Sequence, residues 1–209
     1  MLALLMAAAA VPTAIDAERA FARDAERLGQ WTAFARYAHR DAVMFTPQAV
    51  WAHEYVRTRK NPPRAMRWWP NASLVSCDGR TAVNTGATLS ADGRSHGQFT
   101  SVWQRDKAGW QWVYNANERV ATPRARRAKP LVRRASCRGR PVPPPLIAAA
   151  PAVAAPRGAT PADIGRGVSA DRTLAWLWRV EAKGARQFRA FLWNGTHYEQ
   201  VVYNQTAGK

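Results

Sequence analysis

The chain has 209 residues, which is enough for one ordinary domain with an appendage or for two very small domains. Hydrophobic residues make up 47% and charged residues 22% of the sequence, and this composition excludes a wholly disordered chain. The two cysteines are too few for a disulfide-framework miniprotein or a four-cysteine zinc module. No apolar run reaches the roughly 18 residues of a membrane helix, so we expect no transmembrane span.

The charge is strongly positive and unevenly spread. Lys and Arg number 31 against 14 Asp and Glu, a formal net charge of +17, and residues 121–170 hold ten of the basic residues but only one acidic residue. The basic run 124–140 could bind nucleic acid or another anionic surface. It contains no aromatic residue on which bases could stack, and the interpretation that we favour is a solvated linker.

The N-terminal residues 1–15 are apolar and too short to span a bilayer. Small residues at 8–10 fit a cleavage site, and weaker alternatives lie at Ala14 and Ala17. We therefore predict a secretory signal peptide and a periplasmic or secreted protein, although the basic n-region is missing. The alternative is a buried first turn of the helix that follows.

Two helices are predicted next, because apolar residues recur at helical spacing over 17–30 and again over 31–40. Asp16 is the expected N-cap of the first helix and Gly29 its C-cap. A short strand is predicted at 43–45. Short helices are predicted at 51–59 and, after Pro62-Pro63, at 64–69.

The pattern then changes to strands at 73–77, 81–89, 98–105 and 110–117. Asp-Gly pairs at 78–79 and 92–93 separate the first three of these strands and favour tight hairpins. Alternation in the last strand predicts that Trp110, Trp112 and Tyr114 share one face. Helices followed by an antiparallel meander indicate an α+β fold with the helices packed on the sheet.

The C-terminal half divides into a linker and a small unit. Residues 121–170 are basic and then rich in Pro and Ala, which predicts a linker outside the core. Residues 171–209 predict a three-stranded β-meander with Leu174, Trp176, Trp178 and Val180 on one face. The predicted organisation is thus a signal peptide at 1–15, a domain at 16–120, a linker at 121–170 and a β-meander extension at 171–209.

Several local strings resemble the nuclear transport factor 2-like superfamily, which includes SnoaL-like polyketide cyclases and ketosteroid-isomerase-like proteins. These are Ala17–Phe21, Asp41–Phe45, Gly109–Val113 and the longer stretch 44–69, which is similar to uncharacterised exported bacterial members. The resemblance covers about residues 16–120. It implies a curved sheet wrapped around helices, forming a cone with an apolar pocket, and possible homodimers through the open face of the sheet.

The aromatic residues of the meander and helices are the candidate lining of that pocket. The candidates are Tyr37, Tyr55, Trp68, Trp69, Asn84, Trp103, Trp112 and Tyr114. Ordinary core packing of sheet on helix is the alternative, and it is the interpretation that we favour for the aromatic residues. No Asp and Tyr pair could be matched to the acid–base groups of the family's enzymes, since Asp78, Asp92 and Asp106 all fall in predicted turns.

His39 and Asp41, with His53 beyond them, are weak candidates for catalysis. Their spacing matches no zinc signature, so we expect no metal site, and nothing in the sequence indicates a cofactor. Cys77 and Cys137 lack a thiolate-activating motif and would form a disulfide in an exported protein, the alternative being two free thiols.

The leading functional hypothesis is an exported protein that binds a small hydrophobic ligand in the cone or acts as an interaction module. The alternatives are a cyclase, isomerase or dehydratase, and a protein that binds anionic surfaces or nucleic acid through residues 124–140.

Overall fold

The computed structural model describes residues 11–149 and 163–207. The first ten residues, which include the predicted cleavage site at 8–10, lie outside the described residues. The chain begins with helix α1 (Ala14–Leu28), whose N-terminus is closed by a capping box. Thr13 Oγ1 accepts from the Asp16 backbone N–H and the Asp16 carboxylate accepts from the Thr13 N–H, so Thr13 is the N-cap in place of the predicted Asp16.

Helix α2 (Gln30–Tyr37) follows directly after Gly29, which has φ +99° and ends α1 as predicted. It stops three residues earlier than predicted. Residues 38–40 instead begin strand β1 (Ala38–Phe45), because this segment pairs in parallel with a strand far along the sequence. The chain then forms β2 (Ala49–Trp51) and α3 (Ala52–Arg57).

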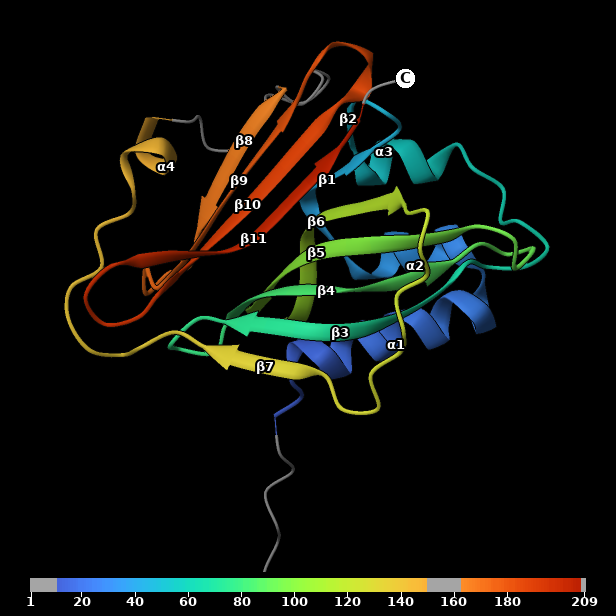
Figure 1. Cartoon of the computed structure of the whole chain (residues 1–209). Coiled ribbons are helices and arrows are strands. Elements are labelled where there is room, and N and C mark those ends of the chain that lie inside the picture. Colours follow the sequence, from blue (N-terminus) through green and yellow to red (C-terminus); the bar gives the residue numbers. More distant parts are fainter. Residues whose placement is uncertain (1–10, 150–162, 208–209) are drawn as a thin grey trace, which may run out of the picture.

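The large sheet is built mainly from β3 (Arg67–Val75), β4 (Thr81–Leu89), β5 (His96–Asp106) and β6 (Gly109–Arg119) (Figure 1). These four strands pair antiparallel in sequence order, as the meander predicts. Within the described residues the full strand order is β2-β1-β6-β5-β4-β3-β7. The sheet is mixed, because β1 and β7 (Leu131–Arg134) each pair in parallel with their neighbours.

The predicted helix at 64–69 is wrong, since β3 begins at Arg67 and continues through Pro70. Proline is tolerated here because β7 pairs with β3 only from Ala72 to Val75, so the outer edge of the strand is unpaired at Pro70. The register against β4 shifts between Pro70 and Ala72, and Asn71 is the extra residue of this bulge.

A second sheet has the order β11-β10-β9-β8. Its strands are β8 (Ile164–Val168), β9 (Leu174–Val180), β10 (Arg186–Trp193) and β11 (Tyr198–Thr206), with a short 3₁₀ turn, η1 (Ala182–Gly184), between β9 and β10. The segment for which the sequence predicts a linker thus contributes two strands, β7 and β8, and a short helix, α4 (Pro145–Ala149). β7 is stabilised by β3, which is distant in sequence, and β8 by β9, the next strand along the chain. Local composition does not reveal the pairing with β3.

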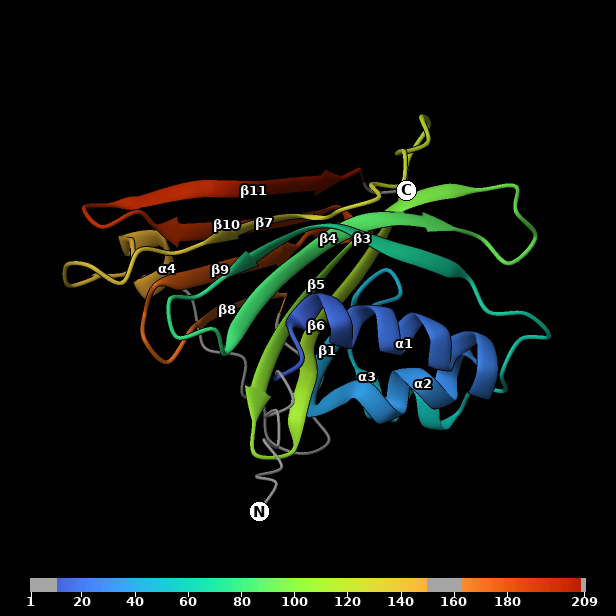
Figure 2. The same cartoon turned by 90° about the horizontal axis from the view of Figure 1, so that it is seen from below.

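The structure has three layers, as Figure 2 shows: the N-terminal helices, the large sheet and the C-terminal sheet. One core, built around Phe21, Phe34 and Trp103, lies between the helices and the large sheet. A second core, which includes Trp176 and Trp178, lies between the two sheets. The C-terminal sheet therefore docks on the face of the large sheet that the helices leave uncovered.

Residues of β6 divide between these cores in a way that strict alternation does not predict. Trp112 packs with the helices, but Tyr114 lies in the core between the sheets. The register pairs Trp112 with Trp103 and Tyr114 with Val102, so β6 carries one extra residue, Val113. This β-bulge turns Tyr114 to the opposite face and corrects the predicted alignment of Trp112 and Tyr114.

No helix in the described part of the chain is both long and apolar enough to cross a membrane.

Candidate functional site

A buried carboxylate lies at the closed centre of the helix-facing core. The apolar face of α1 repeats at Ala14, Ala17, Phe21 and Ala25, and Glu18 falls on this face, one position after Ala17. Its side chain is fully buried. Glu18 is not among the candidate residues of the sequence analysis, although a charged residue on a helix's apolar face is a signal that the sequence offers.

Four side chains donate hydrogen bonds to the Glu18 carboxylate. Trp68 Nε1 donates to Oε1 at 2.9 Å. Asn84 Nδ2 at 3.2 Å, Ser101 Oγ at 2.5 Å and Trp103 Nε1 at 2.6 Å reach Oε2. These donors come from β3, β4 and β5, so one carboxylate joins α1 to three strands.

Burial raises the pKa of Glu18 above its ordinary value, and the four hydrogen bonds, which favour the charged form, oppose the rise. The two indole groups can only donate, so they require an acceptor at this position. Asn84 Nδ2 also donates to the carbonyl of Ala14 at 3.0 Å, which ties the network to the start of α1. The network therefore joins α1 to β3, β4 and β5 next to Trp68, and we call Glu18 and its four donors the floor of the pocket.

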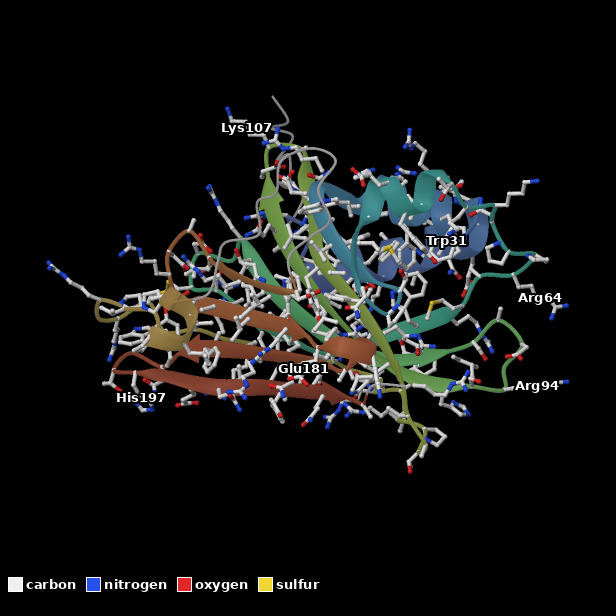
Figure 3. All side chains as sticks on the ribbon, turned by 90° about the horizontal axis from the view of Figure 1, so that it is seen from above. Trp31, Arg64, Arg94, Lys107, Glu181 and His197 are labelled. Carbon is white, nitrogen blue, oxygen red and sulfur yellow. A yellow bond between two sulfur atoms is a disulfide. The ribbon has the colours of Figure 1, made fainter. Side chains whose placement is uncertain are left out.

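Above this floor is a pocket of about 260 Å³ between the helices and the sheet. Most of its lining is aromatic or Met, with a few uncharged polar groups. The lining residues are Phe21, Gln30, Trp31, Phe34, Met44, Phe45, Thr46, Tyr55, Met66, Trp68, Thr88, Phe99, Asn115 and Asn117. Figure 3 places Trp31 toward the end of the molecule that carries Arg64 and Arg94, away from Lys107 in the β5–β6 turn.

Some polar side chains of the pocket already have hydrogen-bond partners in the protein, and one does not. Thr88 Oγ1 donates to Asn117 Oδ1 at 2.9 Å, and Gln30 Oε1 accepts from the backbone N–H of Met66 at 3.0 Å. The half-buried Asn115 amide makes no hydrogen bond with any of the described residues. It is thus available to a molecule in the pocket.

Two of the candidate lining residues, Tyr55 and Trp68, line this pocket. Asn84 and Trp103 lie beneath it in the Glu18 network. Trp112 is fully buried against Phe21 and Phe34 as plain core.

The other three candidates lie elsewhere. Tyr37 donates to Asp24 at 3.1 Å and borders a different hollow, near the β5–β6 turn. Trp69 borders a hollow on the outer side of α1 and β3. Tyr114 lies between the two sheets, where it packs on Phe188.

His39 and Asp41 lie in β1, where the sequence predicts the end of the helix over 31–40. His39 Nδ1 accepts from the Asp41 N–H at 3.2 Å, and the Asp41 side chain is 56% exposed. His53 interacts through Nε2 with the carbonyl of Ala38 at 3.2 Å. None of the three borders the cone pocket, and the described residues contain no cluster of His, Cys, Asp or Glu that could hold a metal ion.

The face of the large sheet opposite the pocket holds a second buried charge. Glu118 of β6 pairs with Arg186 of β10 at 2.8 Å, and the two side chains are 5% and 6% exposed. The Arg186 guanidinium also lies 4.5 Å from the centroid of the Phe45 ring. Burial raises the pKa of Glu118, and Arg186 opposes that rise.

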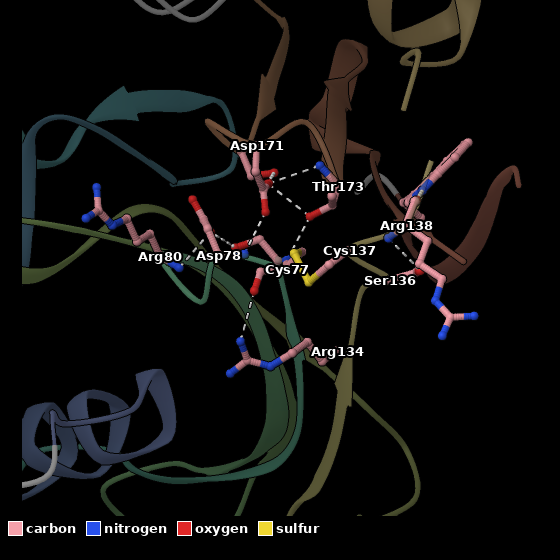
Figure 4. The surroundings of a disulfide bond; sticks show 12 residues. Cys77, Asp78, Arg80, Arg134, Ser136, Cys137, Arg138, Asp171 and Thr173 are labelled. Atoms are coloured by element: carbon pink, nitrogen blue, oxygen red, sulfur yellow. Dashed lines mark hydrogen bonds between the residues drawn. A yellow bond between two sulfur atoms is a disulfide. The ribbon is translucent and has the colours of Figure 1, made fainter. Parts of the chain in front are cut away.

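A disulfide joins Cys77, in the β3–β4 hairpin, to Cys137, beyond β7, with a Cα–Cα distance of 5.2 Å (Figure 4). The same hairpin contacts the β8–β9 turn. The Cys77 N–H donates to Thr173 Oγ1 at 2.8 Å, and the Asp78 N–H donates to Asp171 Oδ2 at 2.7 Å. These hydrogen bonds join the β8–β9 turn of the C-terminal sheet to the end of the large sheet, and the disulfide joins the segment after β7 to the same hairpin.

Comparison with known proteins gives structural neighbours only: no family model and no curated protein matches the sequence. A ketosteroid isomerase-like protein from Parabacteroides distasonis is 14% identical with a TM-score of 0.43, over 51% of this chain and 88% of that one. An aromatic ring hydroxylase-like protein from Novosphingobium aromaticivorans is 14% identical with a TM-score of 0.37, over 51% and 86%. A protein from Exiguobacterium sibiricum, described as a calcium/calmodulin-dependent kinase II association domain, is 15% identical with a TM-score of 0.38, over 54% and 98%.

Each of these similarities covers about half of this chain. They concern the fold alone, because one fold supports many activities.

Proposed function

We propose that this protein binds a small, flat and mostly apolar molecule in the cone pocket. The observation that carries the proposal is the Asn115 amide, which lacks a partner among the described residues and borders a pocket lined by aromatic rings. Apolar walls with a few placed polar groups are typical of ligand sites. The volume of about 260 Å³ is below the ~300–1,000 Å³ of drug-sized ligands, which favours a molecule with a single ring.

The lining of the pocket favours binding over acid–base chemistry. Among the described residues that border it there is no carboxylate, histidine, thiol, Lys or Arg. The Glu18 carboxylate lies beneath Trp68 and already accepts four hydrogen bonds. A cyclase, isomerase or dehydratase of the type considered above would need a base within hydrogen-bond reach of its substrate.

The test uses benzamide, acetophenone and phenol as probes. Trp31 and Trp68 border the pocket, so a bound ring should change the intrinsic fluorescence of the protein. We expect saturable binding, with benzamide and acetophenone weakened about tenfold by Asn115→Leu, which keeps the volume but removes the amide.

The matched control is Gln200→Leu, which removes an exposed amide on β11 and should leave the binding unchanged. Absence of saturable binding for all three probes would contradict the proposal. Equal affinity in the Asn115→Leu variant would contradict the role of the amide.

We also propose that the protein is exported to the periplasm or secreted. The apolar residues 1–15 support this, as does the Cys77–Cys137 disulfide, since such bonds persist in oxidising compartments. Cleavage after Ala10 would leave the Thr13 capping box whole, whereas cleavage after Ala14 or Ala17 would remove it. Mass spectrometry of the mature protein should show a new N-terminus at Val11 and no free thiol, and an intact residue 1 would contradict export.

Any homodimer would have to use a surface other than the face expected from the family resemblance. The protein's own β9 and β10 cover that face of the large sheet. Sedimentation equilibrium tests the homodimer.

A further inference from the structure

Five arginines border a hollow on the outer side of α1, which shares one lining residue, Trp68, with the cone pocket. Arg19 and Arg23 lie one turn apart on the exposed side of α1, and Arg67 begins β3. Arg126 and Arg127 come from the basic segment after β6. The hollow measures about 390 Å³ and is also bordered by the half-buried Trp69 and by one acidic residue, Glu26. We call it the arginine groove.

The basic segment is held in place over this groove by one side chain. Asn71 Nδ2 donates to the carbonyl of Ala125 at 3.0 Å, and Asn71 Oδ1 accepts from the N–H of Arg127 at 2.9 Å. Asn71 is the extra residue of the bulge in β3, and bulges commonly redirect a side chain beside a functional site. The position of Arg126 and Arg127 is therefore built into the fold and is not that of a freely solvated linker.

The positive charges of the groove outnumber the negative charges beside them, which are Glu26 in its lining and Asp16, which interacts electrostatically with Arg19 and Arg23. Within the described ranges 11–149 and 163–207, none of the five arginines forms an ion pair. Five guanidinium groups against these two carboxylates leave an excess of three positive charges at neutral pH. A concave site lined by one sign of charge concentrates the field and attracts ions of the opposite sign.

The charge and volume of the groove favour a small molecule with phosphate groups over a carboxylate or a nucleic acid. One carboxylate would neutralise only a fraction of the excess, whereas each phosphate group carries more charge and matches the fork of a guanidinium. The volume lies within the ~300–1,000 Å³ of small-molecule sites. Nucleic acid is less suited, because stacking of bases requires exposed aromatic rings and Trp69 is half-buried with its Nε1 fully buried.

We propose that the arginine groove binds a small molecule that carries at least two phosphate groups. Trp68 borders both the groove and the cone pocket, but none of the five arginines borders the cone pocket, and the proposal does not depend on the proposed function of that pocket. Phosphate groups of this kind occur in free organic phosphates and in lipid headgroups, and the experiment distinguishes these two sources.

The experiment measures the binding of inorganic tripolyphosphate to the full chain by isothermal titration calorimetry at low and high salt. The variant Arg126→Gln/Arg127→Gln should weaken binding at least about tenfold, because it removes two guanidinium groups that form charge-assisted hydrogen bonds with phosphate. The control Arg57→Gln/Arg94→Gln removes the same charge from two exposed arginines that border neither pocket and should change the affinity less than about twofold.

Asn71→Ala supplies a second variant that leaves every charge in place. It releases residues 125 and 127 and should weaken tripolyphosphate binding severalfold, whereas attraction by net charge alone would be unaffected. An unchanged affinity in Arg126→Gln/Arg127→Gln, or equal losses in it and in the control pair, would overturn the proposal.

Two further ligands identify the source of the phosphate. Phosphatidylcholine vesicles doped with cardiolipin, whose headgroup carries two phosphate groups, should bind in preference to tripolyphosphate, with the same dependence on the variants, if the natural ligand is a headgroup. Weaker binding of these vesicles than of tripolyphosphate would indicate a free phosphate compound. Tighter binding of an oligothymidylate than of either, lost in the same variants, would overturn the small-molecule proposal in favour of nucleic acid.

Discussion

The indole N–H of Trp68 donates to the buried Glu18 carboxylate at 2.9 Å, and the same Trp68 ring borders the cone pocket. The floor of the pocket is thus fixed by a hydrogen bond to a helix, and not by apolar packing alone. A change in Glu18 should therefore alter both the stability of the protein and the shape of the pocket.

Substitution of Glu18 should destabilise the protein strongly. Glu18→Ala leaves two indole N–H groups, a hydroxyl and an amide without their acceptor, and each buried unsatisfied group costs about 1–3 kcal/mol. We expect a loss of about 3 kcal/mol or more in the free energy of unfolding, measured by urea denaturation. Glu18→Gln keeps one acceptor oxygen and should lose less, and Glu54→Gln, an exposed change on α3, should have almost no effect. A Glu18→Ala protein as stable as the wild type would contradict the role of the network.

The stability should also depend on pH through Glu18. Burial raises the pKa of this group in the folded protein above its ordinary value of 4.5, so the folded state holds the proton more tightly than the unfolded state. The stability contributed by protonation is fully present below pH 4.5 and is lost as the pH rises through the folded-state pKa.

Urea denaturation of the wild type and of Glu18→Gln at a series of pH values from 4.5 upward measures this contribution. The wild type should lose stability relative to the variant as the pH rises. Glu118 contributes in the same direction to both proteins, so the difference between them isolates Glu18. Parallel curves would show that the pKa of Glu18 is not raised.

Removal of one partner of the Glu118–Arg186 pair should strongly lower the free energy of unfolding. Arg186→Met leaves the Glu118 carboxylate buried without its partner, a change that typically costs about 3–5 kcal/mol. The double variant Glu118→Gln/Arg186→Met removes both charges and should recover part of the loss. Thermal and urea unfolding of the two single variants and the double variant measure this coupling, and simple additivity of the single losses would show that the pair is not coupled.

Loss of the disulfide should destabilise the chain without changing its fold. Cys77 and Cys137 are 60 residues apart, and closing a loop of that length contributes on the order of 4 kcal/mol in the chain-entropy model. Cys77→Ser/Cys137→Ser should unfold at a lower urea concentration than the wild type while its far-ultraviolet circular dichroism is unchanged. Dithiothreitol should have the same effect on the wild type and none on the variant. Equal midpoints for the wild type and the variant would contradict a stabilising role.

Local sequence determined much of the meander. The Asp78-Gly79, Asp92-Gly93 and Asn194-Gly195 pairs each fall in a turn between paired antiparallel strands, because these residues favour tight hairpins wherever the flanking segments can pair. Alternation in β9 placed Leu174, Trp176, Trp178 and Val180 in one core as predicted.

Hydrophobic periodicity predicted the wrong secondary structure where a segment pairs with a strand distant in sequence. Residues 64–69 and 38–40 carry helical patterns, yet the chain is extended at Arg67–Trp69, which pairs with β4, and at 38–40, where Ala38 pairs with β6. The orientation of Tyr114 depends on a bulge opposite Val102 and Trp103, and a bulge leaves no mark in the alternation of a single strand.

The sequence by itself determined the α+β class, the order of the meander and the apolar faces, because these follow from local periodicity and turn chemistry. Only the tertiary structure decided which polar groups those faces enclose. Four donors from three strands meet Glu18, and one bulged asparagine holds two arginines beside α1. Such groupings form between residues tens of positions apart, and no local pattern encodes them.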